Sequence, residues 1–523
     1  MKTLSLLLLV GFIFTACSED DNGIGNPGPA LDFISYDLGE KSVSGVSGVA
    51  TFNELQGGAV QLIIEVVGTS AGNMHPAHIH MNSAFEGGSI IVPLEDVDGA
   101  TGLSITEFSS DVDGNSISFE DIEGLDAYIN VHLSANALGT IVAQGDIGEN
   151  DLTGEEKSYD LGEKDVAGIS GTVLFQERVN GFALATISLD GTPADGTHPA
   201  HIHMNSALEG GGIIFTFNPV NGATGMSVTD TSESGQAGEE PLIYNDIVEI
   251  DAYVNVHLSA SALGTIVAQG DIGQNELTGE EKSYVLGEKD APGISGTVLF
   301  EERVNGEALA TISLVGTPDG GVHPAHIHMN TVVEGGSILY TFNSVDGTTG
   351  MSQSNVAALD DASEFGYADV LEVDGYVNVH LSASALGTIV AQGDIGENGL
   401  TGEEKSYDLD EKDAPGISGT VLFQERENGE ALATISLVGT PDGGVHPAHI
   451  HSGNAAVGGP VILTFTSVDG TTGMSQSNVA ELNDGTEFGY ADVLEVDGYV
   501  NVHLSASDLG TIVAQGDIGA NVE

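Results

Sequence analysis

Short stretches in which apolar and polar residues alternate run through most of this chain, and glycine or asparagine bounds many of them. Residues 171–176, 183–189 and 252–257 are examples, and all three are rich in β-branched side chains. Alternation with this composition is typical of β-strands that bury one face. No stretch places apolar residues at helical spacing over three turns, and residues 356–359 offer at most one turn. The pattern therefore predicts an all-β protein.

The pattern of strands repeats along the chain. The motif His-Pro-Ala-His-Ile-His begins at residues 75, 198, 323 and 446, which is a spacing of 123–125 residues. That spacing is close to the usual size of one domain, so four tandem domains are expected. Each should contain roughly seven or eight strands in an antiparallel β-sandwich or Greek-key barrel. The predicted domains, called repeats 1 to 4 below, are residues 33–150, 156–275, 281–398 and 404–521.

Two kinds of connection follow from the local sequence. An Asn-Gly pair at 180, 305 and 428 predicts a type I′ hairpin turn, which needs positive φ at both central residues. Repeat 1 has Gln-Gly-Gly at 56–58, which permits the same reversal. The joints between repeats are short and charged, so we expect them to be semi-rigid. They are residues 153–159, 278–284 and 401–407.

All sixteen histidines of the chain lie in two motifs per repeat, His-Pro-Ala-His-Ile-His and a later Asn-Val-His. Strand alternation places Ile202 on the face opposite to His201 and His203, and it places the two valines of 253–257 opposite to His257. If the aliphatic side chains face the core, these histidines face away from it. The residues predicted to form one group in each repeat are His78, His80 and His132; His201, His203 and His257; His326, His328 and His380; and His449, His451 and His503.

Three neutral imidazoles on one surface suit Cu(II) or Zn(II), and three ligands leave one position open for a further ligand. The first interpretation is therefore that each repeat binds one copper or zinc ion. Affinity should then fall below the ordinary histidine pKa of about 6.5. The second interpretation is structural, in which the histidines only hydrogen-bond the loop above them, with Tyr253 and Asn255 as partners in repeat 2. Both interpretations stay open on the sequence alone.

The first histidine of each motif stands three residues before the second, so strand alternation would put the two on opposite faces. It is also followed by a proline, and it is therefore expected in the loop that enters the strand. It would serve there as a fourth ligand or take no part. These histidines are His75, His198, His323 and His446.

The motifs carry a resemblance to a known family. Ala-His-Ile-His, a following Glu-Gly-Gly, the strand Tyr-Val-Asn-Val-His and a terminal Gly-Asp-Ile resemble the CHRD domain, which is named from chordin and occurs in tandem in secreted bacterial proteins. The resemblance covers nearly all of each repeat. It departs in the last strand, where the family tends to have Gly-Glu-Ile-Arg-Gly and this chain has no arginine at 264–270. The resemblance implies an extracellular all-β module without a defined activity.

A weaker likeness is to copper–zinc superoxide dismutase, which is also a Greek-key barrel with a His-x-His pair and a later histidine. This chain has no cysteine pair, no additional ligands for a zinc site and no arginine near the last strand. A protein this acidic would also repel superoxide. We therefore expect a protein that binds or displays rather than catalyses, with a metalloenzyme of superoxide-dismutase type as the alternative. No recurring Ser-His-Asp arrangement supports nucleophilic catalysis.

Charge limits the partners. Seventy-eight acidic and eleven basic residues give a formal net charge of −67. Such a surface repels nucleic acid and anionic lipid. We expect no nucleic-acid partner, contact with the membrane only through a lipid anchor, and an extracellular partner that the sequence does not identify.

The first residues predict export. Lys2 and the apolar run 4–14 are typical of a secretory signal, and residues 14–17 resemble the lipobox of bacterial lipoproteins, with Phe14 in place of the usual leucine. Residues 1–17 are thus predicted to be a lipoprotein signal peptide, with Cys17 lipidated. The acidic residues after Cys17 resemble the export tag of some bacterial surface lipoproteins, and 18–32 reads as a flexible tether. We expect an outer-membrane lipoprotein exposed at the cell surface, without disulfides because Cys17 is the only cysteine.

Overall fold

The structure, a computed structural model, describes residues 30–522. The predicted signal peptide, its lipidation site Cys17 and most of the predicted tether lie outside these residues. Among the residues described, no helix is both long enough and apolar enough to cross a membrane.

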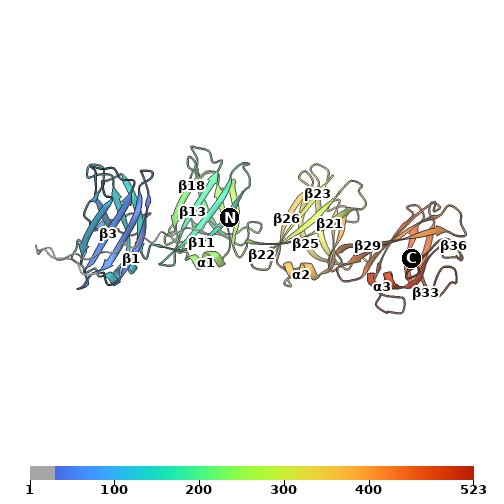
Figure 1. Ribbon diagram of the computed structural model, residues 1–523. Helices are drawn as coiled ribbons and strands as arrows, with labels where there is room; N and C mark the ends of the chain where they lie inside the picture. The colour runs from blue at the N-terminus through green and yellow to red at the C-terminus, as the bar shows by residue number, and fades with distance from the viewer. Residues whose placement is uncertain (1–29, 523) are drawn as a thin grey trace, which may run out of the picture. The chain divides into compact units, whose positions relative to one another are not determined.

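The described residues fold into four antiparallel β-sheet domains, one for each repeat (Figure 1). Alternation sets the faces of the strands, as in β3 (Val60–Val67), where Val60, Leu62 and Ile64 are buried and the residues between them are more exposed. The predicted all-β fold of four tandem antiparallel domains is therefore confirmed.

Repeats 1 and 2 each form a ten-stranded sheet. The strand order in repeat 1 is β4-β7-β8-β3-β2-β1-β10-β9-β5-β6, and repeat 2 has the same order in its own numbering. The strands of repeat 1 are β1 (Phe33–Glu40), β2 (Ser47–Glu54), β3 (Val60–Val67), β4 (Met74–His75), β5 (Ala77–Met81), β6 (Ile90–Pro93), β7 (Val97–Asp98), β8 (Leu103–Phe108), β9 (Asp126–His132) and β10 (Ile141–Gly148). Those of repeat 2 are β11 (Leu152–Glu163), β12 (Ser170–Arg178), β13 (Ala183–Asp190), β14 (Thr197–His198), β15 (Ala200–Met204), β16 (Ile213–Thr216), β17 (Val220–Asn221), β18 (Met226–Asp230), β19 (Asp251–His257) and β20 (Ile266–Gly273).

Repeats 3 and 4 are closed eight-stranded barrels, with the order β21-β22-β23-β26-β25-β24-β27-β28 in repeat 3 and the corresponding order in repeat 4. The strands of repeat 3 are β21 (Leu277–Glu288), β22 (Ser295–Arg303), β23 (Ala308–Val315), β24 (Val322–Met329), β25 (Ile338–Asp346), β26 (Met351–Val356), β27 (Asp374–His380) and β28 (Ile389–Gly396). Those of repeat 4 are β29 (Leu400–Glu411), β30 (Ser418–Arg426), β31 (Ala431–Val438), β32 (Val445–Ser452), β33 (Val461–Asp469), β34 (Met474–Val479), β35 (Asp497–Ser505) and β36 (Asp508–Gly519).

The expected strand number holds for repeats 3 and 4 and is too low for repeats 1 and 2. The segment that is one strand in β24 is two strands, β4 and β5, in repeat 1, and they are separated at Pro76. Proline has no N–H to donate to a neighbouring strand, so pairing is interrupted there. In repeat 3 the same place appears as a register shift between His323 and Ala325.

Each repeat contains one short helix that the sequence did not predict, and the predicted turn at 356–359 is not a helix. In repeat 3 the helix buries Tyr367 and Val370. Two core-facing residues are too few to give a helical period, so the pattern could not reveal it. The helices are η1 (Phe119–Gly124), α1 (Tyr244–Glu249), α2 (Tyr367–Glu372) and α3 (Tyr490–Glu495).

The predicted hairpins form at the Asn-Gly pairs, but their predicted turn type is wrong. In repeat 3 the Gly306 N–H donates to the Arg303 carbonyl at 2.9 Å. Gly306 has φ +83°, whereas Asn305 is not in the left-handed region. A type I′ turn needs positive φ at both central residues, so this is a longer turn in which glycine alone supplies it.

The chain groups into two compact units by its internal contacts. The first contains repeat 1 together with residues 175–185 and 229–232, and the second contains the rest of repeat 2 with repeats 3 and 4. The segments expected as joints are not separate linkers. Most of each lies in the long first strand of the following repeat, which is β11, β21 or β29.

Candidate metal centre

Two neighbouring strands bring the predicted histidines together in every repeat. In repeat 1, His78 and His80 lie on β5 and His132 ends β9, and the pairing sets His78 opposite Asn130 and His80 opposite Tyr128. Three candidate ligand atoms, one from each histidine, lie within 4.8 Å of one another. The predicted convergence is confirmed for all four groups, which we call the three-histidine clusters: His78, His80 and His132; His201, His203 and His257; His326, His328 and His380; His449, His451 and His503.

The clusters face away from the hydrophobic core, as alternation predicts. Ile79 and Val131 belong to the core of repeat 1, whereas the histidines beside them point to the opposite face. This face is nevertheless only partly open to solvent, since His132 is 6% exposed and His78 and His80 are partly buried. Two loops cover it, one after β5 and one after β9.

The covering loops fix the tautomers of two histidines in each cluster. Nδ1 of His80 lies 2.9 Å from the Gly88 carbonyl oxygen, and Nδ1 of His132 lies 2.6 Å from the Leu138 carbonyl oxygen. A carbonyl can only accept, so each Nδ1 carries the hydrogen and each Nε2 keeps its lone pair. The equivalent pairs are His203 with Gly211, His257 with Leu263, His328 with Gly336, His380 with Leu386, His451 with Gly459 and His503 with Leu509.

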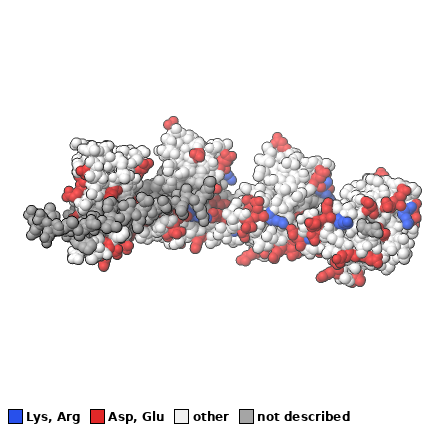
Figure 2. All heavy atoms as spheres, viewed as in Figure 1, with Lys and Arg blue, Asp and Glu red and all other residues white. Residues whose placement is uncertain are grey.

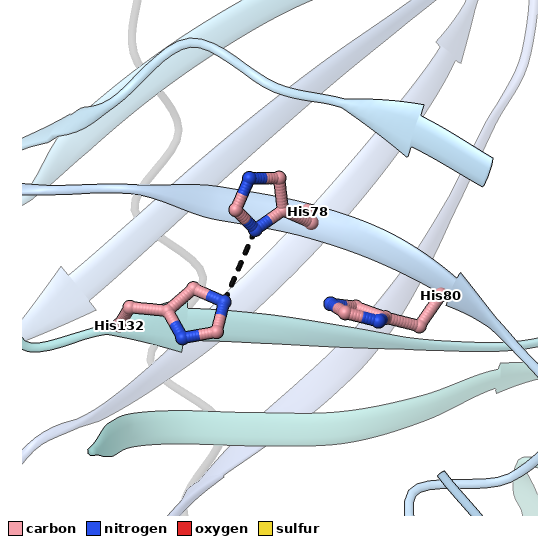
Figure 3. Close-up of side chains that lie close together, drawn as sticks. All are labelled: His78, His80 and His132. Atoms are coloured by element: carbon pink, nitrogen blue, oxygen red, sulfur yellow. Dashed lines mark hydrogen bonds between the residues drawn. The ribbon is translucent and has the colours of Figure 1, made fainter. Parts of the chain in front are cut away.

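The remaining histidine offers its Nδ1 to the same space. In repeat 1, Nδ1 of His78 lies 3.1 Å from Nε2 of His132, and Figure 3 shows the ring of His80 directed toward this pair. In repeats 2 and 3 the corresponding nitrogens are buried and have no hydrogen-bond partner among residues 30–522. These orphaned atoms are Nδ1 of His201 and His326, and Nε2 of His203, His257, His328 and His380.

An ion would satisfy these nitrogens. A buried polar atom without a partner costs about 1–3 kcal/mol, and one ion shared by the three nitrogens would remove that cost. Ligand nitrogens about 2.0–2.1 Å from a tetrahedral ion stand about 3.3 Å apart. Nδ1 of His78 and Nε2 of His132 are 3.1 Å apart, close to this spacing, and all three ligand atoms lie within 4.8 Å of one another. The donor set of three imidazoles fits Cu(II) or Zn(II) and leaves a coordination position open.

Burial favours the neutral form of two histidines in each cluster. Burial, followed by the neighbouring charges of His257 and His203, lowers the pKa of His201 to about 4. The same kinds of cause lower the pKa of the corresponding residues His78, His326 and His449. Burial also lowers the pKa of the third histidine against the opposing effect of its bond to the loop carbonyl, and these residues are His132, His257, His380 and His503. Neutral imidazoles at pH 7 are the form that binds metal.

A tyrosine on the strand beside the His-x-His pair stacks on one histidine of each cluster, whereas the sequence suggested only that Tyr253 would be a hydrogen-bond partner. The rings of His80 and Tyr128 stack with centroids 4.9 Å apart and planes 19° apart. The Gly88 N–H donates to the Tyr128 hydroxyl at 3.1 Å, so Tyr128 holds the residue that orients His80. A Cβ at Gly88 would overlap the Met81 carbonyl oxygen. In the sequence, the Gly-Gly pair that follows the His-x-His motif indicates this close approach of the loop backbone to the strand.

The histidine considered as a fourth ligand lies outside the cluster, and it is in a strand, which corrects the expectation that it lies in the entering loop. His75 is 3% exposed and belongs to strand β4. Its Nδ1 lies 3.0 Å from the His132 carbonyl oxygen, and the His132 N–H donates to the Pro76 carbonyl at 2.8 Å. The pair His75-Pro76 therefore holds the backbone of the third ligand from both sides. His198, His323 and His446 make the same contact at 3.2 Å.

Acidic groups surround the clusters at a distance. Asp96 acts electrostatically on His78, Glu239 on His201 and Asp360 on His326, in each case favouring positive charge. Figure 2 shows acidic side chains spread over the visible surface with few basic ones among them. Such a field attracts cations and repels anions.

Comparisons with known proteins identify no family. No family model matches the sequence, and no curated protein matches it. Four chains among the solved structures match. One of them, described as a biofilm-associated protein, BSP domain, is 10% identical, with 98% of this chain and 100% of that chain covered and a TM-score of 0.13. A likeness this weak carries no argument, and the resemblance to the CHRD domain stays a prediction.

Proposed function

We propose that each repeat binds one Cu(II) or Zn(II) ion through its three-histidine cluster. The observation that carries the proposal is the convergence of three imidazole nitrogens in each repeat, which in repeats 2 and 3 are buried and have no hydrogen-bond partner within residues 30–522. The ligand atoms would be Nδ1 of the first histidine and Nε2 of the other two. The carbonyl groups of the covering loops would hold two of the rings in the binding tautomer, which is the usual role of second-sphere partners.

We further propose that the protein displays these domains outside the cell as a surface-anchored lipoprotein. The support is the lipobox-like segment ending at Cys17, the acidic residues after it and the repeated β-domains. Cys17 would carry the lipid, and the partner would be an extracellular molecule. The strongly acidic surface disfavours nucleic acid and anionic lipid as partners.

A metalloenzyme of superoxide-dismutase type is the second candidate, because three ligands leave a coordination position open. The net charge of −67 argues against it, since it would repel an anionic substrate instead of guiding it to the site.

Calorimetric titration of the full chain with Zn(II) and Cu(II) tests the proposal. We expect four equivalents to bind and the melting temperature to rise, because a ligand that binds only the native state stabilises it. His203→Ala should lower the stoichiometry to three. Met204→Ala, which changes the exposed neighbour on the same strand, is the matched control and should retain four.

Two results would contradict the proposal. The first is the absence of stoichiometric binding. The second is a His203→Ala variant that loses stability equally with and without metal, as a purely structural histidine would. Superoxide turnover by the metal-loaded protein well above that of free copper would favour the enzyme.

A further inference from the structure

The three arginines of the chain occupy one equivalent position in repeats 2, 3 and 4. Each ends the second strand of its repeat and is at most 1% exposed. A buried guanidinium needs a partner of opposite charge, and here the partner is always an aspartate on the last strand of the preceding repeat. The pairs are Arg178 with Asp146 at 3.0 Å, Arg303 with Asp271 at 2.8 Å and Arg426 with Asp394 at 2.8 Å.

The hairpin that follows each arginine completes the joint between two repeats. In the joint between repeats 3 and 4, the Glu427 N–H donates to the Gly399 carbonyl at 2.9 Å and the Asn428 N–H donates to the Glu397 carbonyl at 3.0 Å. Repeat 4 is therefore docked on the last strand of repeat 3 and on the turn after that strand.

Asp394 holds a loop of its own repeat as well. One of its carboxylate oxygens accepts from Nη1 of Arg426 at 2.8 Å, and the other accepts from the Val332 N–H at 2.7 Å. Val332 lies in the loop 330–336, which follows the His-x-His pair on β24. A single carboxylate thus separates Arg426 from this loop. The corresponding bonds run from the Ala84 N–H to Asp146 at 2.6 Å and from the Ala207 N–H to Asp271 at 2.7 Å.

Hydrogen bonds within the loop connect Val332 to the candidate metal centre. Nδ2 of Asn330 donates to the Gly335 carbonyl at 2.9 Å, which closes the loop on itself. The next carbonyl, that of Gly336, accepts from Nδ1 of His328 at 3.0 Å. Because the loop is short and closed, the position of Val332 sets where the Gly336 carbonyl meets His328.

A second connection runs through the neighbouring strand. Asp394 lies opposite Tyr376 in the pairing of β27 with β28. The ring of Tyr376 stacks on that of His328 with centroids 5.0 Å apart, and its hydroxyl accepts the Gly336 N–H at 3.2 Å. Both connections end at the same candidate ligand, His328.

The arginine also favours the charged form of the aspartate. Burial raises the pKa of Asp394, and the charge of Arg426 is the largest effect that opposes this. The same holds for Asp146 and Arg178. A charged carboxylate is the stronger hydrogen-bond acceptor, so the arginine strengthens the bond that holds the loop. Apolar residues often replace a buried ion pair without loss of stability, so joining two repeats does not by itself require the pair.

We infer that Arg178, Arg303 and Arg426 are positioning residues for the metal centre of the preceding repeat, and that docking of the next repeat raises the affinity of that centre for Cu(II) or Zn(II). This inference rests on the proposed function and adds a form of regulation to it. The docked arginine holds the loop, and the loop holds one ligand with its Nε2 lone pair free for the ion. A bound ion restrains the same loop in turn, so metal binding and docking stabilise each other.

Zinc titration of a full-length chain with one intact cluster tests the coupling. His80→Ala, His203→Ala and His451→Ala together leave only the cluster of repeat 3. Adding Arg426→Met should lower its zinc affinity at least about fivefold, which is the lower end of ordinary coupling between two sites. Arg178→Met is the matched control, because it removes the equivalent arginine from a joint that repeat 3 does not share. It should leave the affinity unchanged.

The reverse effect needs no substitution at the joint. Since coupling is reciprocal, zinc bound to the same one-cluster chain should slow hydrogen exchange at the amides of Glu427 and Asn428 by a similar factor. The amides of Val304 and Asn305, which bond across the joint between repeats 2 and 3, should be unaffected. Unchanged zinc affinity in the folded Arg426→Met chain, or unchanged exchange at Glu427 and Asn428, would overturn this inference alone. Failure of the unsubstituted chain to bind zinc would overturn the proposed function and the inference with it.

Discussion

Asp271 accepts a hydrogen bond from Arg303 of the next repeat at 2.8 Å, and its other carboxylate oxygen accepts the Ala207 N–H at 2.7 Å. Ala207 belongs to the loop whose Gly211 carbonyl orients His203. One aspartate therefore connects the joint between repeats to the loop above the candidate metal centre. The same arrangement occurs at Asp146 and Asp394.

Arg426→Met should open the joint between repeats 3 and 4. Removing one partner of a buried ion pair costs about 3–5 kcal/mol, because the other charge stays buried. Burial already raises the pKa of Asp394 and the Arg426 charge opposes this, so the pKa should rise further in the variant. The amides of Glu427 and Asn428, which bond across the joint, should exchange their hydrogens about two to three orders of magnitude faster. Arg303→Met is the control and should leave these two amides protected.

His198→Ala should weaken metal binding at repeat 2 without abolishing it. His198 contacts the His257 carbonyl at 3.2 Å, and loss of such a second-sphere contact typically lowers affinity about 10- to 100-fold. Zinc titration should then show one weakened site among the four. Val220→Ala removes volume from the residue paired with His198 and keeps the histidine, so it controls for the cavity. Equal effects of the two substitutions would show that packing alone is responsible.

Metal binding should persist to lower pH than ordinary histidines allow. The unfolded chain takes up protons near pH 6.5, whereas burial lowers the pKa of His201 to about 4 in the fold. The lowered pKa contributes stability that is complete above pH 6.5 and is lost as the pH falls from 6.5 toward 4. Because burial lowers the pKa of both His201 and His257, zinc affinity at repeat 2 should fall less steeply below pH 6.5 than three ordinary histidines would give. A loss of about a thousandfold for each unit below 6.5, which corresponds to three ordinary histidines each taking up a proton, would contradict the buried cluster.

Cys17→Ala should release the protein from the membrane fraction or misdirect it, because the lipidated cysteine is the proposed anchor. Fractionation of cells that produce the variant measures this, and protease treatment of intact cells tests surface exposure of the parent. A variant that fractionates with the membrane as before would place the anchor elsewhere.

The alternation of side chains determined which face of each strand carries the histidines. Ile79 is fully buried in the core, and His78 and His80 lie on the other face, because successive residues of a strand point to opposite sides whatever surrounds them. The hairpin positions and the repeat spacing were equally readable, since they depend on local sequence. The hairpin turn type and the short helices were not, because they depend on contacts of a few residues with the rest of the domain.

The tertiary structure decided what the histidines can do. His78 and His132 are more than fifty residues apart in the sequence. Only the pairing of β5 with β9 brings Nδ1 of His78 to 3.1 Å from Nε2 of His132. The Gly88 carbonyl accepts a hydrogen bond from Nδ1 of His80, which leaves the lone pair on Nε2. Nδ1 of His75 contacts the His132 carbonyl, so it is not directed into the cluster. The pairing of Arg303 with Asp271 likewise joins two repeats. Local periodicity assigns a side chain to a face, but convergence, tautomer and burial arise between segments distant in sequence, so they depend on the completed fold.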